Sequence, residues 1–352
     1  MKFGVLYIPD YYPDRYTSAS HYYGEMLDQI QHEEALGFDG VFFAEHYTGG
    51  YAFPSPPIFA TAVAQRTKRI RLGTGVTLLP LNNPVRTAEE YAMLDVLSDG
   101  RLDFGIGRGV LKTEYELFGV PENESHGRFH ESLDIVLQAW TQESLTYEGK
   151  YYTFRDVLTL PKPVQQPHPP VWAACAVTPE SFVWAGQKGF HAMTAPFAYP
   201  QHAPLRSKLD LYWSALKAAG HDPTTREVLG VYHLYVAETD EAAHAVARQY
   251  FQQYFKFFAG LDRKAAFQSA DYKEYKGGLS QGMGRLSYED LDKGDCMIFG
   301  SPETCVQRLR RAQAGYGLTY PIFEVNFGGF PHQETMKSLE LFSKYVMPAL
   351  RG

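Results

Sequence analysis

An arginine set among glycines is the most suggestive chemical feature of the sequence. It lies in LDFGIGRGVLKTEY, residues 102–115, where Arg108 stands between Gly107 and Gly109. A guanidinium group is a natural partner of a phosphate, and glycine leaves the backbone open to a ligand. The alternative is an ordinary surface salt bridge at the end of a strand. Position alone does not decide between these two interpretations.

Two better-known motifs within this stretch do not apply. Asp103-Phe104-Gly105 matches the magnesium-binding triplet of protein kinases, but the HRD motif, the strand lysine and the early glycine-rich loop of a kinase are absent. The glycines follow a GxGxG spacing, whereas a dinucleotide-binding loop needs GxGxxG after its first strand. We therefore interpret Gly105 as a residue that keeps the end of a strand narrow.

A histidine-containing loop is the next candidate. In EHYTGGYAFPSPP, residues 45–57, His46 is followed by glycines and aromatic residues. Imidazole titrates near neutral pH, so His46 is a candidate acid or base if the loop lies at the mouth of a barrel. In isolation, a histidine with a purely structural role is the better interpretation.

Two further segments could contact a ligand. The glycines of GTGVTLLPLNNPVR, residues 73–86, would let a flat ring approach the backbone. In VTPES, residues 177–181, Thr178 before Pro179 is a good start for a helix. A phosphate could bind at this helix N-terminus through Thr178, Ser181 and backbone amides, and Arg108 could reach the same anion. The alternative is a capped helix with no ligand.

Alternating strand and helix patterns predict the scaffold that would bring these segments together. Strands are expected at Phe3–Ile8, Asp39–Ala44, Ile70–Val76, Arg101–Ile106, Val171–Cys175, Phe190–Thr194, Gly230–Ala237 and Tyr320–Asn326. Helices are expected at Tyr23–Leu36, Pro57–Arg66, Thr87–Ser98, Arg128–Gln142, Pro179–Lys188, Ala203–Ala219, Glu241–Phe258, Pro302–Ala314 and Gln333–Met347. Eight such units favour an α/β protein with a TIM (β/α)8 barrel, whose strand ends carry the active site.

Two segments interrupt the alternation. Residues 145–169 contain a hairpin-like LTYEGKYYTF and a proline-rich LPKPVQQPHPP. Residues 260–296 are rich in glycine, lysine, aspartate and serine and are too long for a simple connector. We expect residues 260–296 to form an insertion or mobile lid before the last β/α unit. The whole chain, residues 1–352, is expected to be a single domain.

Composition and charge limit the class of protein. The chain has 352 residues, 45% hydrophobic and 21% charged, as in an ordinary globular enzyme. A net charge of −7 argues against nucleic-acid binding. Cys175, Cys296 and Cys305 lack CxxC spacing, so neither a disulfide framework nor a metal site is expected. No segment has the pattern of a signal peptide or the length of a membrane span, which predicts a cytoplasmic protein.

The segments named above also resemble one known family. The similar stretches are the opening MKFG, GFDGVFFAEHYT, IRLGTGVTLLPLNNPVR, LDVLSDGRLDFGIGRG, YELFG, the PVW…WAGQKG segment and FEVNFGG…LFSKYVMPAL. Over nearly its whole length, the chain resembles the bacterial luciferase-like flavin-dependent monooxygenases, and among them the luciferase alpha chain. The resemblance implies a TIM barrel that binds FMN in its reduced form, FMNH2, which a separate NAD(P)H:flavin reductase supplies.

Residue roles are implied by position in the resemblance. Arg108 corresponds to the phosphate-binding arginine, Gly75-Val76 to a non-proline cis peptide beside the flavin ring, and His46 to the catalytic histidine. Glu114 keeps an acidic residue near the flavin, with a catalytic role. The implied cofactor-binding set is Gly75, Val76, Gly107, Arg108, Val110, Leu111, Val177, Thr178, Ser181 and Met193, and the implied substrate-pocket wall is Tyr47, Tyr51 and Phe53.

The sequence departs from the family pattern at three places. Gly107 stands where luciferases have a reactive cysteine. The missing side chain would leave space beside the flavin. Tyr47 replaces a second histidine, and Ala176-Val177 replace an acidic-polar pair on the phosphate side. Light emission is therefore not implied.

The resemblance implies oxygenation of a small or medium-sized organic substrate, such as an aldehyde or ketone, by a C4a-peroxyflavin formed from FMNH2 and O2. A lid, to which residues 270–290 correspond, would exclude water, and His46 would handle the proton. Two alternatives stay open. One is an F420-dependent hydride-transfer enzyme of the same superfamily, and the other is a non-catalytic flavin-binding partner subunit.

Dimerisation is also implied by the resemblance, either as a homodimer or with a homologous chain. Helices 57–66 and 87–98 carry small apolar residues that suit close packing against a partner, namely Ala60, Ala62, Ala64, Ala88 and Ala92. The alternative is that these faces pack only on their own barrel.

Overall fold

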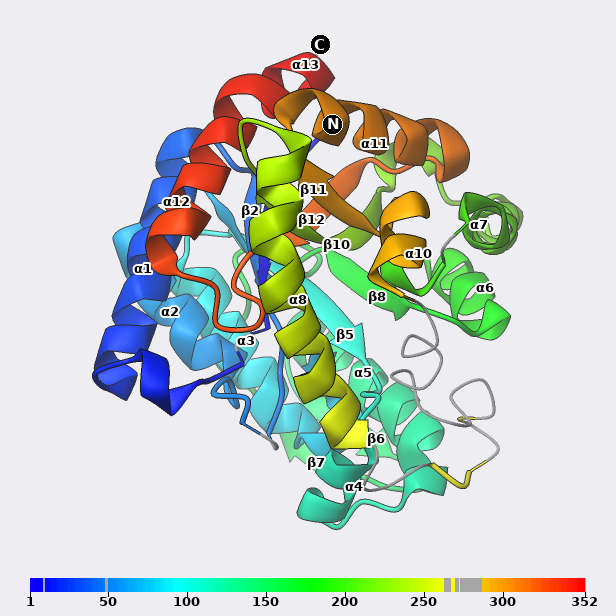
Figure 1. The fold of residues 1–352 in the computed structure, drawn as a ribbon. Coiled ribbons are helices and arrows are strands. Elements are labelled where there is room, and N and C mark those ends of the chain that lie inside the picture. The colour runs from blue at the N-terminus through cyan, green and yellow to red at the C-terminus, as the bar shows by residue number, and fades with distance from the viewer. Residues whose placement is uncertain are drawn as a thin grey trace.

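Eight parallel strands form a closed barrel (Figure 1). The computed structural model describes residues 1–8, 10–47, 50–199, 201–262, 267–269, 272 and 287–351, with the side chains of 258–262 excepted. The barrel strands are β1 (Gly4–Tyr7), β2 (Gly40–Phe43), β3 (Arg71–Thr74), β5 (Leu102–Gly107), β8 (Val171–Cys175), β9 (His191–Thr194), β10 (Val228–Val236) and β12 (Tyr320–Glu324). They pair in this order, and β12 pairs with β1 to close the ring. Each strand overlaps one predicted run, so the predicted TIM barrel is confirmed.

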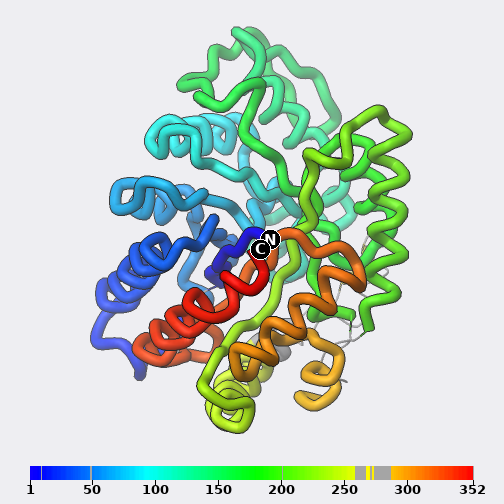
Figure 2. The backbone as a smooth tube through the Cα atoms, turned by 90° about the horizontal axis from the view of Figure 1, so that it is seen from above, coloured from blue at the N-terminus to red at the C-terminus, as the bar shows by residue number. Residues whose placement is uncertain are grey.

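Helices surround the strands, as the axial view in Figure 2 shows. They are α1 (Ala19–Leu36), α2 (Pro56–Arg66), α3 (Pro84–Leu97), α4 (Lys112–Phe118), α5 (Ser125–Thr141), α6 (Pro179–Lys188), α7 (His202–Ala218), α8 (Asp240–Asp262), α10 (Tyr288–Lys293), α11 (Pro302–Tyr316), α12 (His332–Leu341) and α13 (Met347–Arg351). The amino group of Met1 donates to the Leu350 carbonyl at 3.4 Å, so the two ends of the chain meet. None of the described helices is long and apolar enough to cross a membrane.

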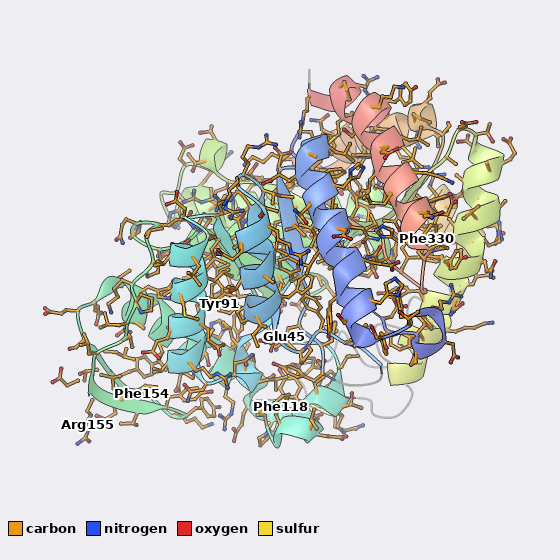
Figure 3. All side chains as sticks on the ribbon, turned by 90° about the vertical axis from the view of Figure 1, so that its left-hand side faces the viewer. Glu45, Tyr91, Phe118, Phe154, Arg155 and Phe330 are labelled. Atoms are coloured by element: carbon orange, nitrogen blue, oxygen red, sulfur yellow. The ribbon has the colours of Figure 1, made fainter. Side chains whose placement is uncertain are left out.

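Some elements were not predicted. The strand β11 (Met297–Gly300) pairs with the second half of β10, and β4 (Thr77–Leu78) pairs with β5. β4 has only two residues, and β11 lies outside the predicted alternation of eight strands and helices. The predicted hairpin is confirmed as β6 (Leu145–Glu148) and β7 (Thr153–Val157), with Phe154 and Arg155 at the edge of the molecule in Figure 3.

The predicted insertion at 260–296 is only partly described. Its first residues continue α8, and its last third contains α10, which begins with a capping box between Ser287 and Asp290. These parts are helical rather than irregular. Residues 263–266, 270–271 and 273–286, which hold most of the expected lid, lie outside the described residues.

The barrel interior is filled by large side chains. They are Leu6, Phe42, Trp172, Met193, Leu229, Val231, Tyr320 and Ile322. At the start of the strands, Arg71 binds both oxygens of Asp103 at 2.7 and 2.8 Å. The aspartate of the kinase-like triplet is therefore a structural ion-pair partner.

Gly105 is required by close packing between neighbouring strands. A Cβ atom at this position would lie 1.7 Å from the carbonyl oxygen of Thr74. The Thr74 hydroxyl also donates to the Gly105 carbonyl at 2.7 Å and accepts from the Gly105 amide at 2.9 Å. The interpretation of Gly105 as a residue that narrows the strand end is confirmed.

The alanines predicted for a dimer interface mostly face inward. Ala60, Ala64, Ala88 and Ala92 are at most 3% exposed and belong to the core between strands and helices. The alternative interpretation is correct for these four residues, since the helical period turns the small side chains toward their own barrel. The large apolar side chains that α2 and α3 expose are Ile58, Met93, Val96 and Leu97.

A buried carboxyl group in α1 predicts a pH-dependent stability. Glu33 is fully buried, accepts a hydrogen bond from the Tyr7 hydroxyl at 2.7 Å, and burial raises its pKa to about 8. Because the unfolded chain loses this proton near pH ~4.5, the stabilisation is complete below that value and is lost as the pH rises through 8. Between pH ~5 and ~8.5, the Tm of wild type should therefore fall further than that of Glu33→Gln. Asp28→Asn, at an exposed site of the same helix, should follow wild type; parallel curves for Glu33→Gln and wild type would contradict the prediction.

Candidate active site

The open end of the barrel lies where the strands end. In β8, Trp172 points into the interior, and Ala174, two residues further, points the same way. Ala174 is nevertheless exposed, and Gly75 and Val76 after β3 are half-buried. The interior is thus filled at the level of Trp172 and accessible to solvent one layer above it. We call this accessible end, which Gly75, Val76 and Ala174 line, the mouth.

An imidazole–carboxylate couple lies at the mouth. The Nδ1 atom of His46, which follows β2, is 3.0 Å from Oε1 of Glu114 in α4. The same oxygen accepts the Tyr47 amide proton at 3.1 Å. The Glu114 side chain is 0% exposed and that of His46 is 15% exposed. A carboxylate only accepts hydrogen bonds, so a hydrogen bond to ionised Glu114 requires the proton on Nδ1 and leaves Nε2 as an acceptor.

A second carboxylate, which the sequence patterns did not identify, fixes the neighbouring loops. Glu45 accepts hydrogen bonds from the Leu78 amide at 2.9 Å, from Asn82 Nδ2 at 2.8 Å, and from the Tyr47 hydroxyl. Burial raises its pKa. Glu45, labelled in Figure 3, is buried. These bonds tie the loop after β2 to the segment after β3, so Glu45 positions its neighbour His46.

The three aromatic residues predicted to form a pocket wall have different surroundings. The Tyr51 ring stacks on His46 with centroids 4.5 Å apart, and Tyr47 is half-buried beside Phe118. Phe53 is 2% exposed and belongs to the core outside the barrel. Its ring packs on Phe43 and Phe59, so these contacts give no support to its predicted place on the pocket wall.

The segment after β3 forms one side of the mouth. The Gly75-Val76 peptide bond is cis, as the resemblance implies. Met193 lies below it, with its sulfur 4.0 Å from a Cβ atom placed on Gly75. At Gly107, a Cβ atom would lie 2.4 Å from Val76 Cγ2. The sequence suggested that Gly107 leaves free space. The structure shows none at its Cβ position, because the Val76 methyl group fills it.

Restoring the family cysteine should therefore be destabilising. Gly107→Cys must displace the stiff Val76 side chain, and overpacking of this kind costs about 1–3 kcal/mol. Chemical denaturation should show this loss, and the double variant Val76→Ala/Gly107→Cys should recover most of it. A Gly107→Cys protein as stable as wild type would show that Val76 yields without cost. Gly105→Ala, which meets backbone rather than a side chain, should be worse and should not be rescued by Val76→Ala.

Arg108 lies at the end of β5 and is half-buried. The Tyr115 hydroxyl donates to its carbonyl oxygen, which holds the turn after the strand. The guanidinium carbon lies 5.0 Å from the ring centre of Tyr272, whose hydroxyl donates to the Tyr115 hydroxyl at 2.9 Å. The described part of the insertion thus contacts the predicted phosphate-binding residue. Leu111, the residue before α4, is buried, and Val110 is half-buried.

Polar side chains of α5 and α6 lie on the same side as Arg108. β8 pairs with β5, so the start of α6 lies beside Arg108. There the Thr178 hydroxyl donates to Ser181 Oγ at 3.2 Å, and neither hydroxyl caps the helix amides; Val177 before them is half-buried. In α5, His130 is 3.2 Å from His126, and burial together with His126, Lys188 and Arg108 lowers the pKa of His130 to about 4. The two histidines were not predicted, although their four-residue spacing places them on one helix face.

A metal site is not apparent in the part of the chain that the structure describes, where no three His, Cys, Asp or Glu side chains are grouped as ligands. The cysteines are buried, and burial raises the pKa of each to about 12, which makes them poor nucleophiles. Among the described side chains at the mouth, the His46–Glu114 couple is the group suited to proton transfer.

Known proteins resemble this chain over most of its length. The family model described as luciferase-like monooxygenase matches residues 1–319. The chain belongs to this family. The oxygenase component of a flavin-dependent trigonelline monooxygenase from Acinetobacter baylyi is 29% identical over 265 residues, which cover 73% of this chain and 72% of that protein. An alkanal monooxygenase alpha chain from Photobacterium leiognathi is 26% identical over 331 residues, 90% of each chain.

Solved structures of the luciferase-like fold agree with this assignment. Monooxygenase RslO1 from Streptomyces bottropensis superposes with a TM-score of 0.87 at 29% identity, covering 99% of this chain and all of that one. The oxygenating constituent of 3,6-diketocamphane monooxygenase from Pseudomonas putida, in complex with FMN, has a TM-score of 0.83 at 21% identity and covers 99% and 98% of the two chains. An F420-dependent secondary alcohol dehydrogenase has a TM-score of 0.76 at 19% identity and covers 100% and 99%. The last two likenesses show the fold alone.

Proposed function

We propose that this luciferase-like protein is a monooxygenase that uses reduced FMN and O2 to oxygenate a small or medium-sized organic substrate. One observation carries the proposal. The His46–Glu114 couple, Arg108 and the start of α6 all follow barrel strands at the same open end of one barrel. An imidazole base and a phosphate-binding side are what a flavin oxygenase requires of its protein. The chain is proposed to act as a single domain.

The side chains present fit FMN in two respects. Arg108 and the amides at the start of α6, which no side chain caps, offer donors for a phosphate, and FMN differs from riboflavin by this group. The Thr178 and Ser181 hydroxyls, which donate to Ser181 Oγ and to the Thr178 carbonyl, would have to rotate to join them. The half-buried backbone at Gly75, Val76 and Val110 is open to a flat ring. The bound flavin would activate O2 and transfer oxygen. The trigonelline monooxygenase, which is similar in sequence, is flavin-dependent, and the diketocamphane enzyme, which is similar in fold, was solved in complex with FMN.

The residues of this chain would handle protons and shape the substrate space. With Nδ1 directed at Glu114, His46 presents Nε2 to take or return one proton, and the buried carboxylate stabilises the imidazolium that results. Ala174, Val76 and Met193 make the mouth apolar and offer the substrate no charge. An uncharged carbonyl compound, such as an aldehyde or ketone, fits such a lining.

Mass spectrometry of products is the direct test. A panel of aldehydes, ketones and other apolar compounds is incubated with the protein, a flavin reductase, NADH, FMN and 18O2. One 18O atom should appear in a product, and it should be absent without flavin and reduced in His46→Ala. A panel wide in size and polarity that yields only hydrogen peroxide, with no labelled product, would count against a monooxygenase.

A hydride-transfer enzyme that uses F420 is the second candidate, because enzymes of that kind have the same fold. Cofactor titration separates the two. FMN binding with little F420 binding supports the monooxygenase, whereas tight F420 binding and oxygen-independent turnover support the alternative. The third interpretation, a non-catalytic partner subunit, is disfavoured by the intact His46–Glu114 couple.

Two partners are part of the proposal. A separate NAD(P)H:flavin reductase would supply FMNH2, and a relative of this chain, the oxygenase component of a trigonelline monooxygenase, supports such a division of labour. A second copy or a homologous chain would cover the exposed apolar residues of α2 and α3, namely Ile58, Met93, Val96 and Leu97.

A further inference from the structure

Two aromatic rings from the insertion are built into the wall beside Arg108. Phe267 and Tyr272 are 6% and 1% exposed, and their rings stack with centroids 3.7 Å apart and an interplanar angle of 4°. The apolar cluster that buries them comes from the segments after β2, β3 and β5 and contains Leu78, Leu81 and Tyr115, with Tyr47, Val76 and Val120 packed against it. The described part of the insertion therefore contacts segments that lie more than 140 residues earlier in the chain.

A carboxylate fixes the backbone of the same segment. Oε1 of Glu122, which lies between α4 and α5, accepts hydrogen bonds from the amides of Gln268 at 2.7 Å and Ser269 at 2.6 Å. Hydrogen bonds to an ionised acceptor are roughly twice as strong as those between neutral groups. Phe267 precedes these amides, and its ring lies 5.8 Å from that of Tyr115. Glu122 thus anchors the segment from outside the mouth.

Tyr272 contacts both the side chain and the turn of Arg108. The guanidinium carbon lies over the Tyr272 ring, 5.0 Å from its centre. The Tyr272 hydroxyl donates to the Tyr115 hydroxyl at 2.9 Å, and the Tyr115 hydroxyl donates to the Arg108 carbonyl oxygen. One tyrosine therefore holds the Arg108 side chain directly and its backbone through Tyr115.

We propose that Tyr272 is a positioning residue for Arg108 and holds its guanidinium in place for the phosphate group of the flavin. The inference rests on the proposed role of Arg108 as the phosphate-binding residue. A long arginine side chain loses rotamer freedom when it binds an anion. A ring that restricts the side chain beforehand reduces this loss, so the phosphate binds more tightly.

One guanidinium can contact the ring and a phosphate at the same time. Its attraction to the face of a tyrosine depends on the positive charge and requires no particular N–H group. Phosphate oxygens are bound by the N–H groups in the plane of the guanidinium, which has five of them. The two contacts therefore support each other. By linkage, a phosphate on Arg108 stabilises the position of Tyr272 by the same factor by which Tyr272 raises the affinity for phosphate.

The comparison of FMN with riboflavin isolates this effect, because the two flavins differ by the phosphate. We define the phosphate ratio as the dissociation constant of riboflavin divided by that of FMN, both measured by fluorescence titration with oxidised flavin. Tyr272→Ala should lower the phosphate ratio by about 3- to 10-fold. Tyr272→Phe keeps the ring and should retain most of the ratio. Tyr345→Ala, which removes a tyrosine that is 48% exposed, is the control and should leave the ratio unchanged.

Glu122 allows the same test without a change at Arg108 or Tyr272. Glu122→Ala removes the acceptor of both amides and should lower the phosphate ratio by about 2- to 5-fold, whereas Glu122→Gln keeps one oxygen and should retain most of it. Glu116→Ala is the matched control, since Glu116 is also an acid 3.8 Å from Lys112 but is 57% exposed. An equal loss in Glu122→Gln and Glu122→Ala would contradict the anchoring role.

The double variant Arg108→Ala/Tyr272→Ala separates positioning from a general structural role. If Tyr272 acts through Arg108, its removal should change the phosphate ratio by less than about twofold once Arg108 is absent. Equal weakening of FMN and riboflavin by Tyr272→Ala, or the same loss of ratio with and without Arg108, would overturn the proposal. A ratio that depends on Arg108 but not on Tyr272 would contradict the positioning role alone. A ratio that does not depend on Arg108 would contradict the phosphate site of the proposed function, and the positioning role with it.

Discussion

Arg108→Ala is expected to weaken FMN binding by about 10- to 100-fold. A hydrogen bond to a charged group contributes about 1.5–3 kcal/mol, and each 1.4 kcal/mol is about tenfold in affinity. Arg108 follows the end of β5, which pairs with β8 before α6, and in the proposed site it would meet the phosphate, the charged group of oxidised FMN. Fluorescence titration with oxidised FMN measures the affinity. The same variant should bind riboflavin almost as well as wild type does, because riboflavin lacks the phosphate.

The controls separate a phosphate contact from a loss of structure. Arg86→Ala removes an arginine that is 76% exposed and pairs with Glu90, so FMN affinity should not change. Tyr272→Phe keeps the ring near Arg108 but removes the hydrogen bond to Tyr115, so it tests whether the described part of the insertion affects this site. If Arg108→Ala weakened FMN and riboflavin equally, the arginine would support the fold of the mouth rather than the phosphate.

The barrel could be predicted because short stretches of sequence are enough to identify its strands and helices. Each strand is a short apolar run buried on both faces, and each is followed by a helical period, so eight such units suffice to define the architecture. β11 was missed because MIFG follows the insertion and lies outside the alternation of eight strands and helices, and because in the described part of the chain it pairs with the second half of β10 rather than within the ring. The inward direction of the alanines on α2 and α3 depends on which helix face meets the barrel, and composition does not reveal this.

The site could be predicted only in part for a related reason. His46, Arg108 and Ser181 lie in segments with a distinctive local pattern at strand ends. Glu122 and Tyr272 are single residues without such a pattern, and only the packing of the insertion beside α4 brings Tyr272 to Arg108. The filling of the space at Gly107 depends on the direction of the Val76 side chain across two strands. Such contacts become visible only when separate segments of the chain are placed beside each other.

His46→Ala is expected to lower the yield of oxygenated product by about 10²- to 10⁴-fold, the usual contribution of a positioned acid–base group. FMN affinity should stay within about twofold of wild type, because Arg108 and the start of α6 are untouched. The NADH consumed should then appear as hydrogen peroxide instead of product. Product and peroxide are quantified together, with a substrate found in the 18O2 panel.

Glu114→Gln provides the matched comparison, because it keeps the size of the Glu114 side chain and removes only its charge. It leaves an acceptor oxygen for His46 Nδ1 but no longer stabilises the imidazolium, so activity should fall less than in His46→Ala, and the pH at which His46 loses its proton should fall. A full product yield from His46→Ala would remove the imidazole from the reaction and would leave Glu114 with the role of holding the Tyr47 backbone. An equal loss in both variants, with no change in the pH profile, would mean that the couple holds the loop in place rather than transferring a proton. The pH profile therefore distinguishes acid–base catalysis at this barrel mouth from a structural role of the same two residues.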